Sequence, residues 1–135
     1  MNKVFLDTSF AIALSADRDK HHQRAEELAD ELEAANTSFV TTRAILLEIG
    51  NALSKLRYRS AAMRLLTTLE NDPKFEIVSL SEELYHRALE LYGDRVDKEW
   101  GLIDCISFVV MKDQGLTKAL TTDNHFQQAG FQILL

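Results

Sequence analysis

Short runs of apolar, strand-forming residues alternate with longer segments of helical periodicity along the chain. The strand-like runs cover residues 3–6, 38–41, 75–80, 118–122 and 131–134. Strands that alternate with helices are joined by right-handed crossovers and form a mostly parallel sheet with helices on both faces. The pattern therefore predicts an α/β fold, a three-layer sandwich whose mostly parallel, roughly five-stranded sheet is flanked by helices.

Helical periodicity marks the segments between these runs. The expected helices cover residues 10–14, 21–35, 43–57, 60–69, 81–93 and 102–112. Ser9 and Ser81 are expected to cap the first and fifth of these helices, and Pro73, the only proline, follows the fourth. Residues 102–112 are apolar at nearly every angle around the helix axis, which predicts a buried helix.

Length and cysteine content limit the class of protein. A chain of 135 residues with 46% hydrophobic content can bury one core, so we expect a single domain over residues 1–135. The lone Cys105 cannot form an internal disulfide, and no secretion signal is evident. No apolar run approaches the roughly 18 residues that span a bilayer. We therefore expect a soluble, cytoplasmic protein without membrane association.

Four acidic residues lie where a chain normally avoids an unpaired charge. Asp7 and Asp123 follow strand-like runs, Asp104 lies inside the apolar helix, and Glu48 borders the apolar stripe of the helix at 43–57. Burying an isolated carboxylate is costly unless it is paired or binds a metal. Open parallel sheets bind ligands at the carboxyl ends of their strands, so we expect the four side chains to meet there.

Each of these acids also has an ordinary structural explanation. Asp104 and Asp7 can stabilise helix amino termini or a tight turn, Glu48 can be a solvated acid near Lys55, and Asp123 can belong to a turn. The convergence of two strand-end acids with two helical acids on one sheet edge favours a shared site.

Carboxylate clusters suit hard divalent cations. Mg2+ and Mn2+ prefer oxygen ligands and retain waters, and they can promote phosphodiester hydrolysis. The histidines, which show no zinc-type spacing with Cys105, are expected to be structural or solvated: His21, His22, His86 and His125. Whether one or two cations bind is left open by the four acids.

The distribution of charge is uneven. The formal net charge of −6 argues against a general polyanion-binding protein. Residues 43–64 nevertheless contain only one acid, Glu48, and five basic residues: Arg43, Lys55, Arg57, Arg59 and Arg64. This segment is either an RNA-facing surface or a solvated helix face.

Four short motifs together resemble the PIN-domain nucleases, and among them the VapC-type toxins of bacterial toxin and antitoxin pairs. The sequences Val-Phe-Leu-Asp7-Thr-Ser9 and Glu48-Ile-Gly-Asn-Ala-Leu are similar to the first two family motifs. Trp-Gly-Leu-Ile-Asp104-Cys-Ile-Ser and Thr-Thr-Asp123-Asn-His-Phe resemble the third and fourth. The motifs occur in the family's order and span the whole chain.

This resemblance implies a metal-dependent endoribonuclease of PIN-like fold. Asp7, Glu48, Asp104 and Asp123 would be the catalytic and metal-binding residues, with Ser9 as a supporting hydroxyl. The implied cofactor is Mg2+, with Mn2+ as a possible substitute. The implied partners are an RNA substrate, a cognate antitoxin and a second copy of the chain in a homodimer. The resemblance identifies neither the RNA nor the antitoxin.

Other functions are compatible with parts of the pattern. A PIN nuclease can process RNA without an antitoxin, and a PIN-like module can bind partners without catalysis. A receiver-like phosphoacceptor domain is also α/β, but it requires an acidic pair after the first strand and a lysine at the end of a late strand. Here Asp7 stands alone after its strand and Lys118 begins its strand.

Overall fold

The computed structural model describes residues 2–135 and contains a five-stranded parallel sheet. Its strands are β1 (Lys3–Leu6), β2 (Ser38–Thr42), β3 (Phe75–Val78), β4 (Lys118–Leu120) and β5 (Gln132–Ile133). They are arranged in the order β3-β2-β1-β4-β5, and all four neighbouring pairs are parallel. The predicted parallel, five-stranded α/β fold is confirmed.

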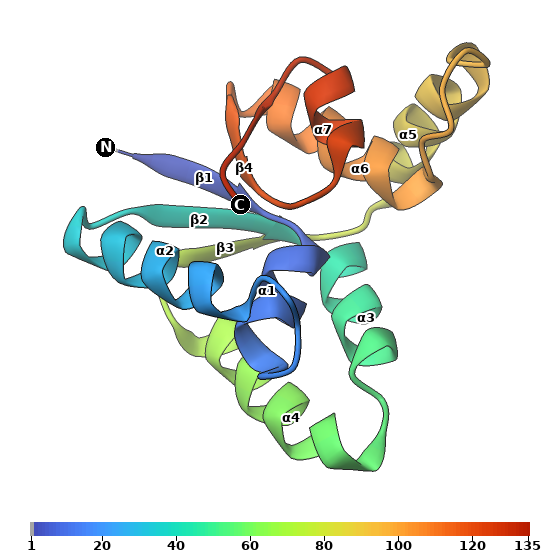
Figure 1. The fold of residues 1–135 in the computed structure, drawn as a ribbon. Helices are drawn as coiled ribbons and strands as arrows, with labels where there is room; N and C mark the ends of the chain where they lie inside the picture. The colour runs from blue at the N-terminus through green and yellow to red at the C-terminus, as the bar shows by residue number, and fades with distance from the viewer. Residues whose placement is uncertain (1) are drawn as a thin grey trace.

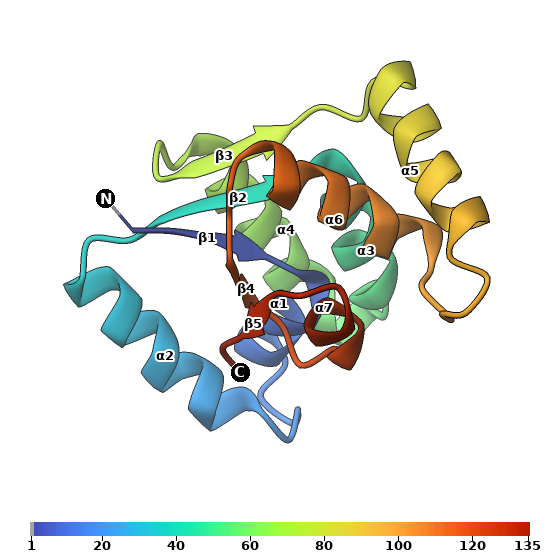
Figure 2. The same ribbon diagram turned by 90° about the horizontal axis from the view of Figure 1, so that it is seen from above.

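Helices cover both faces of this sheet (Figure 1). One face carries α1 (Thr8–Ser15), α2 (His22–Ala34), α3 (Arg43–Ala52) and α4 (Leu56–Asn71). The other face carries α6 (Leu102–Asp113) and α7 (Asn124–Gln128), with α5 (Glu82–Asp94) packed against α6. The view from above in Figure 2 shows α6 and α5 lying on the β3 side and α7 beside β4 and β5.

The central strands and α6 supply the most deeply buried side chains. Phe5 of β1, Val40 of β2 and Leu120 of β4 are inaccessible to solvent. Every residue of α6 from Cys105 to Met111 is buried, as the apolar pattern predicts. Arg87 of α5 donates two hydrogen bonds of 2.6 and 2.8 Å to the Asp113 carboxylate, which joins the middle of α5 to the carboxyl end of α6.

The predicted helix over residues 43–57 is wrong beyond Ala52. The chain turns sharply after α3, with Leu53 only 2% exposed, and α4 begins at Leu56. Leu56, expected on the apolar stripe, is 87% exposed. The Arg59 guanidinium donates hydrogen bonds of 2.6 and 3.1 Å to the Ser54 carbonyl, which satisfies a backbone group left open at this corner.

Other element boundaries also differ from the prediction. The predicted strand ends at 79–80 and 121–122 lie outside β3 and β4, and β5 contains only Gln132–Ile133. Ser81 caps α5 as predicted, since its hydroxyl accepts a 3.0 Å hydrogen bond from the Leu84 amide. Ser9 does not cap α1, because that helix begins at Thr8 and Asp7 occupies the N-cap position. The five-residue α7 was not predicted. Within residues 2–135, no helix combines the length and the apolar character that crossing a membrane requires.

Candidate active site

The site lies where the strand order reverses. Beginning at β1, the chain adds β2 and β3 on one side and then returns to place β4 and β5 on the other. The Asp7 amide donates a 3.2 Å hydrogen bond to the Leu120 carbonyl, which fixes the ends of β1 and β4 side by side. Ligands of open α/β sheets bind outside the carboxyl ends of strands at such a reversal.

Asp7 is the most buried acid at this edge, with only 6% of its surface exposed. Its Oδ2 accepts a 2.6 Å hydrogen bond from the Thr121 hydroxyl and lies 3.4 Å from the Ser9 hydroxyl. Burial raises the pKa of the Asp7 carboxyl from 3.8 to about 6, against the opposing effect of hydrogen bonds from Thr121 and the Thr8 backbone. The negative charges of Glu48 and Asp104 raise this pKa further. Asp7 is therefore held in a site that disfavours its charge unless a cation is present.

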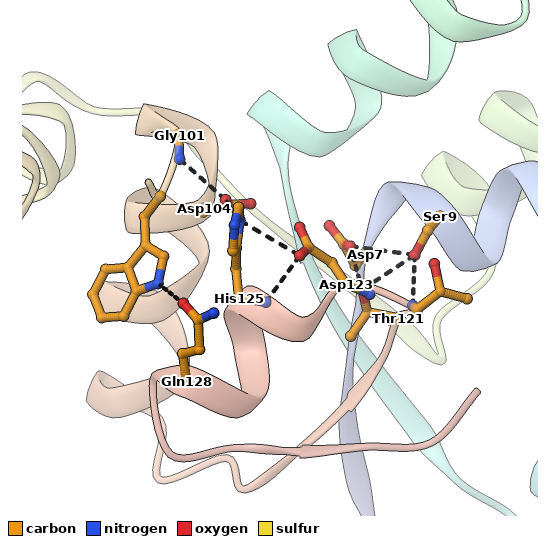
Figure 3. Close-up of polar contacts among 10 residues, drawn as sticks. Asp7, Ser9, Gly101, Asp104, Thr121, Asp123, His125 and Gln128 are labelled. Carbon is orange, nitrogen blue, oxygen red and sulfur yellow. Dashed lines mark hydrogen bonds and ion pairs between the residues drawn. The ribbon is translucent and has the colours of Figure 1, made fainter. Parts of the chain in front are cut away.

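Ser9 and Thr121 connect the two strand ends below the carboxylates. Their hydroxyl oxygens are 3.1 Å apart. Ser9 Oγ accepts a 3.0 Å hydrogen bond from the Thr122 amide, and Thr121 Oγ1 accepts one of 2.9 Å from the Asp123 amide (Figure 3). The predicted supporting hydroxyl, Ser9, thus lies beside Asp7. Thr121 was not predicted, although it contacts Asp7 more closely.

Glu48 reaches the site from α3. The Thr8 hydroxyl, at the first position of α1, donates a hydrogen bond to Glu48 Oε1. The side chain is half-buried, and its charge contributes to the raised pKa of Asp7. The alternative of a solvated Glu48 paired with Lys55 is not found among residues 2–135. Thr8 was missed because the sequence carries no signal for a contact between residues 40 positions apart.

Asp104 occupies the first turn of α6 and performs two tasks. Its Oδ2 accepts a 3.1 Å hydrogen bond from the Gly101 amide, as expected of an acid near a helix amino terminus. The same oxygen lies 3.0 Å from His125 Nδ1 (Figure 3). The side chain is 19% exposed. Asp104 therefore stabilises the start of α6 and is also accessible from solvent at the site.

Asp123 and His125 enter the site from the amino terminus of α7. Asp123 Oδ1 caps this helix by accepting a 2.9 Å hydrogen bond from the His125 amide, and it lies 3.4 Å from His125 Nδ1. His125 was expected to be structural or solvated, but the structure places its ring between two of the predicted site carboxylates. His125 lies only two residues after Asp123 in the sequence, but the helix start that brings the two side chains together was not predicted.

The donor atoms of the site suit a divalent cation. None of the ion pairs found within residues 2–135 joins a lysine or arginine to Asp7, Glu48, Asp104 or Asp123, so no lysine or arginine paired with them offsets their negative charges. One ligand atom from each of Asp104, Asp123 and His125 lies within 4.8 Å of the other two. Asp97, in the loop before α6, accepts hydrogen bonds from Arg95, which lower the pKa of the Asp97 carboxyl to about 2.

Fold and site together define a class: a three-layer α/β protein with a carboxylate cluster at the reversal point of a parallel sheet. A family model for the PIN domain matches residues 4–132, and the chain therefore belongs to the PIN-domain family. The predicted family is confirmed. PIN-domain proteins are metal-dependent nucleases, so the chain is assigned to this class of enzyme and its cofactor to the divalent metals.

Named relatives agree with this assignment. The 23S rRNA-specific endonuclease VapC20 of Mycobacterium tuberculosis is 27% identical over 133 residues, which cover 95% of each chain. The crystal structure of M. tuberculosis VapC20, described as a Sarcin-Ricin loop cleaving toxin, superposes with a TM-score of 0.83 at 26% identity. It covers 95% of both chains.

More distant structures share the fold. VapBC2 from Rickettsia felis, bound to a DNA fragment from its promoter, gives a TM-score of 0.67 at 16% identity and covers 98% of this chain and 97% of its own. FitAcB from Neisseria gonorrhoeae superposes with a TM-score of 0.63 at 19% identity. The match covers 98% of this chain and 96% of the FitAcB chain. At these identities the likeness concerns the fold alone.

Proposed function

We propose that this chain is a Mg2+-dependent endoribonuclease that hydrolyses RNA phosphodiester bonds as the toxin of a toxin and antitoxin pair. One observation carries the proposal: Asp7, Glu48, Asp104 and Asp123 approach one sheet edge from separate elements without a lysine or arginine partner among residues 2–135. The similarity to a named ribosomal RNA endonuclease supports the same activity.

Asp7, Glu48, Asp104 and Asp123 would hold the cation. Their carboxylate oxygens are the ligands that Mg2+ prefers, and Mn2+ can replace Mg2+ at such sites. When bound, a divalent cation lowers the pKa of a coordinated water and stabilises negative charge on the phosphate and on the leaving oxygen. Without a cation, burial first and the charges of Glu48 and Asp104 second raise the pKa of Asp7 and so disfavour its charged form.

The surrounding hydroxyls position these carboxylates. Thr121 and Ser9 hold Oδ2 of Asp7, and Thr8 holds Oε1 of Glu48. Each hydroxyl restricts the rotation of a carboxylate and so preserves the arrangement that a cation requires. We assign Ser9, Thr8 and Thr121 as positioning residues and the four acids as catalytic residues.

The start of α4 is the part of the surface best suited to bind RNA. Lys55, Arg57, Arg59 and Arg64 are exposed, and none of them forms an ion pair with an acid among residues 2–135. The chain contains no Asp or Glu between Glu48 and Glu70. Unneutralised arginine and lysine side chains attract phosphates by charge and by release of counterions. Ribosomal RNA is the first substrate to test, because the relative VapC20 is named for cleaving 23S rRNA.

We further infer a cognate antitoxin and a homodimer. A groove of about 440 Å³ opens beside Glu48 between α3, α5 and α6. Its apolar wall includes Leu47 and Tyr85, which are 61% and 39% exposed. Exposed apolar side chains around a groove are typical of surfaces that bind another protein. Light scattering at several protein concentrations tests the homodimer, which a monomeric mass at all concentrations would contradict.

The proposed activity is tested by incubating end-labelled 23S rRNA fragments with purified protein and Mg2+. We expect specific cleavage, its loss in EDTA and its recovery when excess Mg2+ is restored. Cleavage that persists in EDTA would contradict metal dependence. Retained metal binding without cleavage of any RNA would favour the catalytically silent module. A neighbouring gene for a small protein with a DNA-binding amino terminus would distinguish a toxin from an RNA-processing nuclease.

A further inference from the structure

His125 contributes the nitrogen ligand atom of the group that it forms with Asp104 and Asp123 within residues 2–135. Its Nδ1 lies 3.0 Å from Asp104 Oδ2 and 3.4 Å from Asp123 Oδ1. Both contacts involve the same ring nitrogen, so the imidazole is directed between the two carboxylates (Figure 3). When Nδ1 carries the proton it hydrogen bonds to Asp104, and in the other tautomer the same nitrogen directs a lone pair to that place.

The position of His125 is fixed by the packing of α7. Phe126, the next residue, is fully buried, and its ring centroid lies 5.0 Å from that of Phe108 in α6. The His125 amide is bound by the Asp123 carboxylate that caps the helix. On the other side, Trp100 donates a 3.1 Å hydrogen bond to Gln128 and so ties the start of α6 to α7. The imidazole is therefore held at the site by the core on both sides.

The three donor atoms have the spacing of neighbouring ligands around one cation. In an octahedral shell with metal to ligand distances near 2.1 Å, adjacent donors are about 3.0 Å apart and opposite donors about 4.2 Å. The observed separations of 3.0 and 3.4 Å match adjacent donors, and one ligand atom from each of the three residues lies within 4.8 Å of the other two. Two carboxylates and one imidazole can thus occupy one side of a metal shell and leave the other side open.

We propose that Asp104 Oδ2, Asp123 Oδ1 and His125 Nδ1 form a mixed oxygen and nitrogen cation position, and that His125 makes this position prefer Mn2+ and related transition metals over Mg2+. The inference rests on the proposed metal-dependent function and refines its cofactor. Imidazole is a good ligand for transition metals, whereas Mg2+ is best served by oxygen atoms alone. The side chains of Asp7 and Glu48 offer only oxygen.

Pulsed electron paramagnetic resonance on the Mn2+-loaded protein tests this ligand directly and without RNA. We expect a nitrogen coupling of the size given by a directly bound imidazole in the wild-type protein. His125→Gln should abolish this coupling while retaining an amide that can hydrogen bond to Asp104. His86→Gln is the matched control, because His86 is an exposed histidine on α5 whose Nδ1 contacts only the Glu82 carbonyl. Its spectrum should equal that of the wild type.

Calorimetric titration gives a second measurement on the same proteins. In His125→Gln we expect Mn2+ affinity to fall about tenfold or more while Mg2+ affinity changes far less. Equal weakening of both cations would show that His125 only positions Asp104, and would overturn the inference. If the Mn2+-loaded wild-type protein shows no nitrogen coupling but the protein binds Mg2+ and cleaves RNA, His125 is not a ligand. That result would overturn this inference and leave the proposed function standing. Failure to bind either cation would overturn the proposed function as well.

Discussion

The Thr121 hydroxyl donates a 2.6 Å hydrogen bond to the buried Asp7 carboxylate across 114 residues of sequence. This contact joins the ends of β1 and β4, the two strands between which the order of the sheet reverses. The same hydroxyl accepts a hydrogen bond from the Asp123 amide, so one side chain orients two of the proposed metal ligands. The site therefore depends on a residue that carries no charge.

Replacement of Thr121 by valine should impair both stability and metal binding. Valine preserves the shape of the side chain but removes the hydrogen bond to the Asp7 carboxylate, at a cost of roughly 1.5–3 kcal/mol in the free energy of unfolding. Urea denaturation of the metal-free protein at pH 7.5 measures this cost. Thr121→Ser keeps the hydroxyl and should lie close to the wild type. Equal stability of the valine and serine variants would show that the Thr121 hydroxyl does not stabilise the folded protein.

The raised pKa of Asp7 predicts an unusual dependence of stability on pH. The folded carboxyl binds its proton more tightly than the unfolded one, with a pKa of about 6 instead of 3.8. Stability should therefore fall as the pH rises from about 4 to about 7, because deprotonation then favours the unfolded chain. The difference between the two pKa values corresponds to about 3 kcal/mol in all, of which about 2.4 kcal/mol is lost between pH 4 and pH 7.

Asp7→Asn isolates this contribution. In metal-free buffer, the stability of the variant relative to the wild type should increase by about 2.4 kcal/mol between pH 4 and pH 7. Asp97→Asn serves as the control, since Arg95 lowers the pKa of Asp97 to about 2 and its titration lies below this range. A constant difference between Asp7→Asn and wild type would show that Asp7 has an ordinary pKa.

Divalent metal should reverse the destabilisation that these acids cause. A ligand that binds only the folded protein at 100 times its Kd stabilises it by about 2.7 kcal/mol. Addition of millimolar Mg2+ or Mn2+ should therefore raise the Tm by several degrees in a thermal scan, and Asp7→Asn should respond much less. KCl at the same ionic strength controls for general screening of charge. No change in Tm with Mg2+ or Mn2+ would count against the metal site.

The parallel sheet and the positions of the acids follow from local sequence. The apolar run before Asp7 and the uniformly apolar residues around Asp104 each constrain their own segment, because a buried strand and a buried helix leave few places for a charge. The break between α3 and α4 could not be found in this way. Leu53 and Leu56 continue the same helical periodicity, but only the folded chain buries Leu53 and exposes Leu56.

Contacts between distant residues explain the remaining differences. Thr8, Thr121 and His125 join the site through partners that lie 40, 114 and 21 positions away in the sequence. No periodicity or composition encodes such contacts. The helix α7, with only five residues, is too short to show a helical period, so the role of Asp123 as its cap was also hidden.

The basic start of α4 should contribute to RNA affinity through charge. Replacing Arg57 and Arg59 by glutamine should weaken RNA binding and reduce the slope of log affinity against log salt by about 1.4, if both side chains contact phosphates. Filter binding between 50 and 300 mM salt measures the slope. Lys20→Gln with Arg24→Gln removes the same charge near the acidic helix α2 and should leave the slope unchanged. An equal slope in the first variant would assign Arg57 and Arg59 to a solvated helix face.

The central claim is that a carboxylate-bound cation cleaves RNA, and cleavage by Asp104→Asn tests it most directly. Asparagine preserves the size of the side chain and can still accept the Gly101 amide, so circular dichroism should show an intact fold. We predict that the rate of cleavage of labelled RNA in Mg2+ falls at least a hundredfold, equivalent to about 2.7 kcal/mol in the barrier. Cleavage at the wild-type rate by the folded variant would contradict the account.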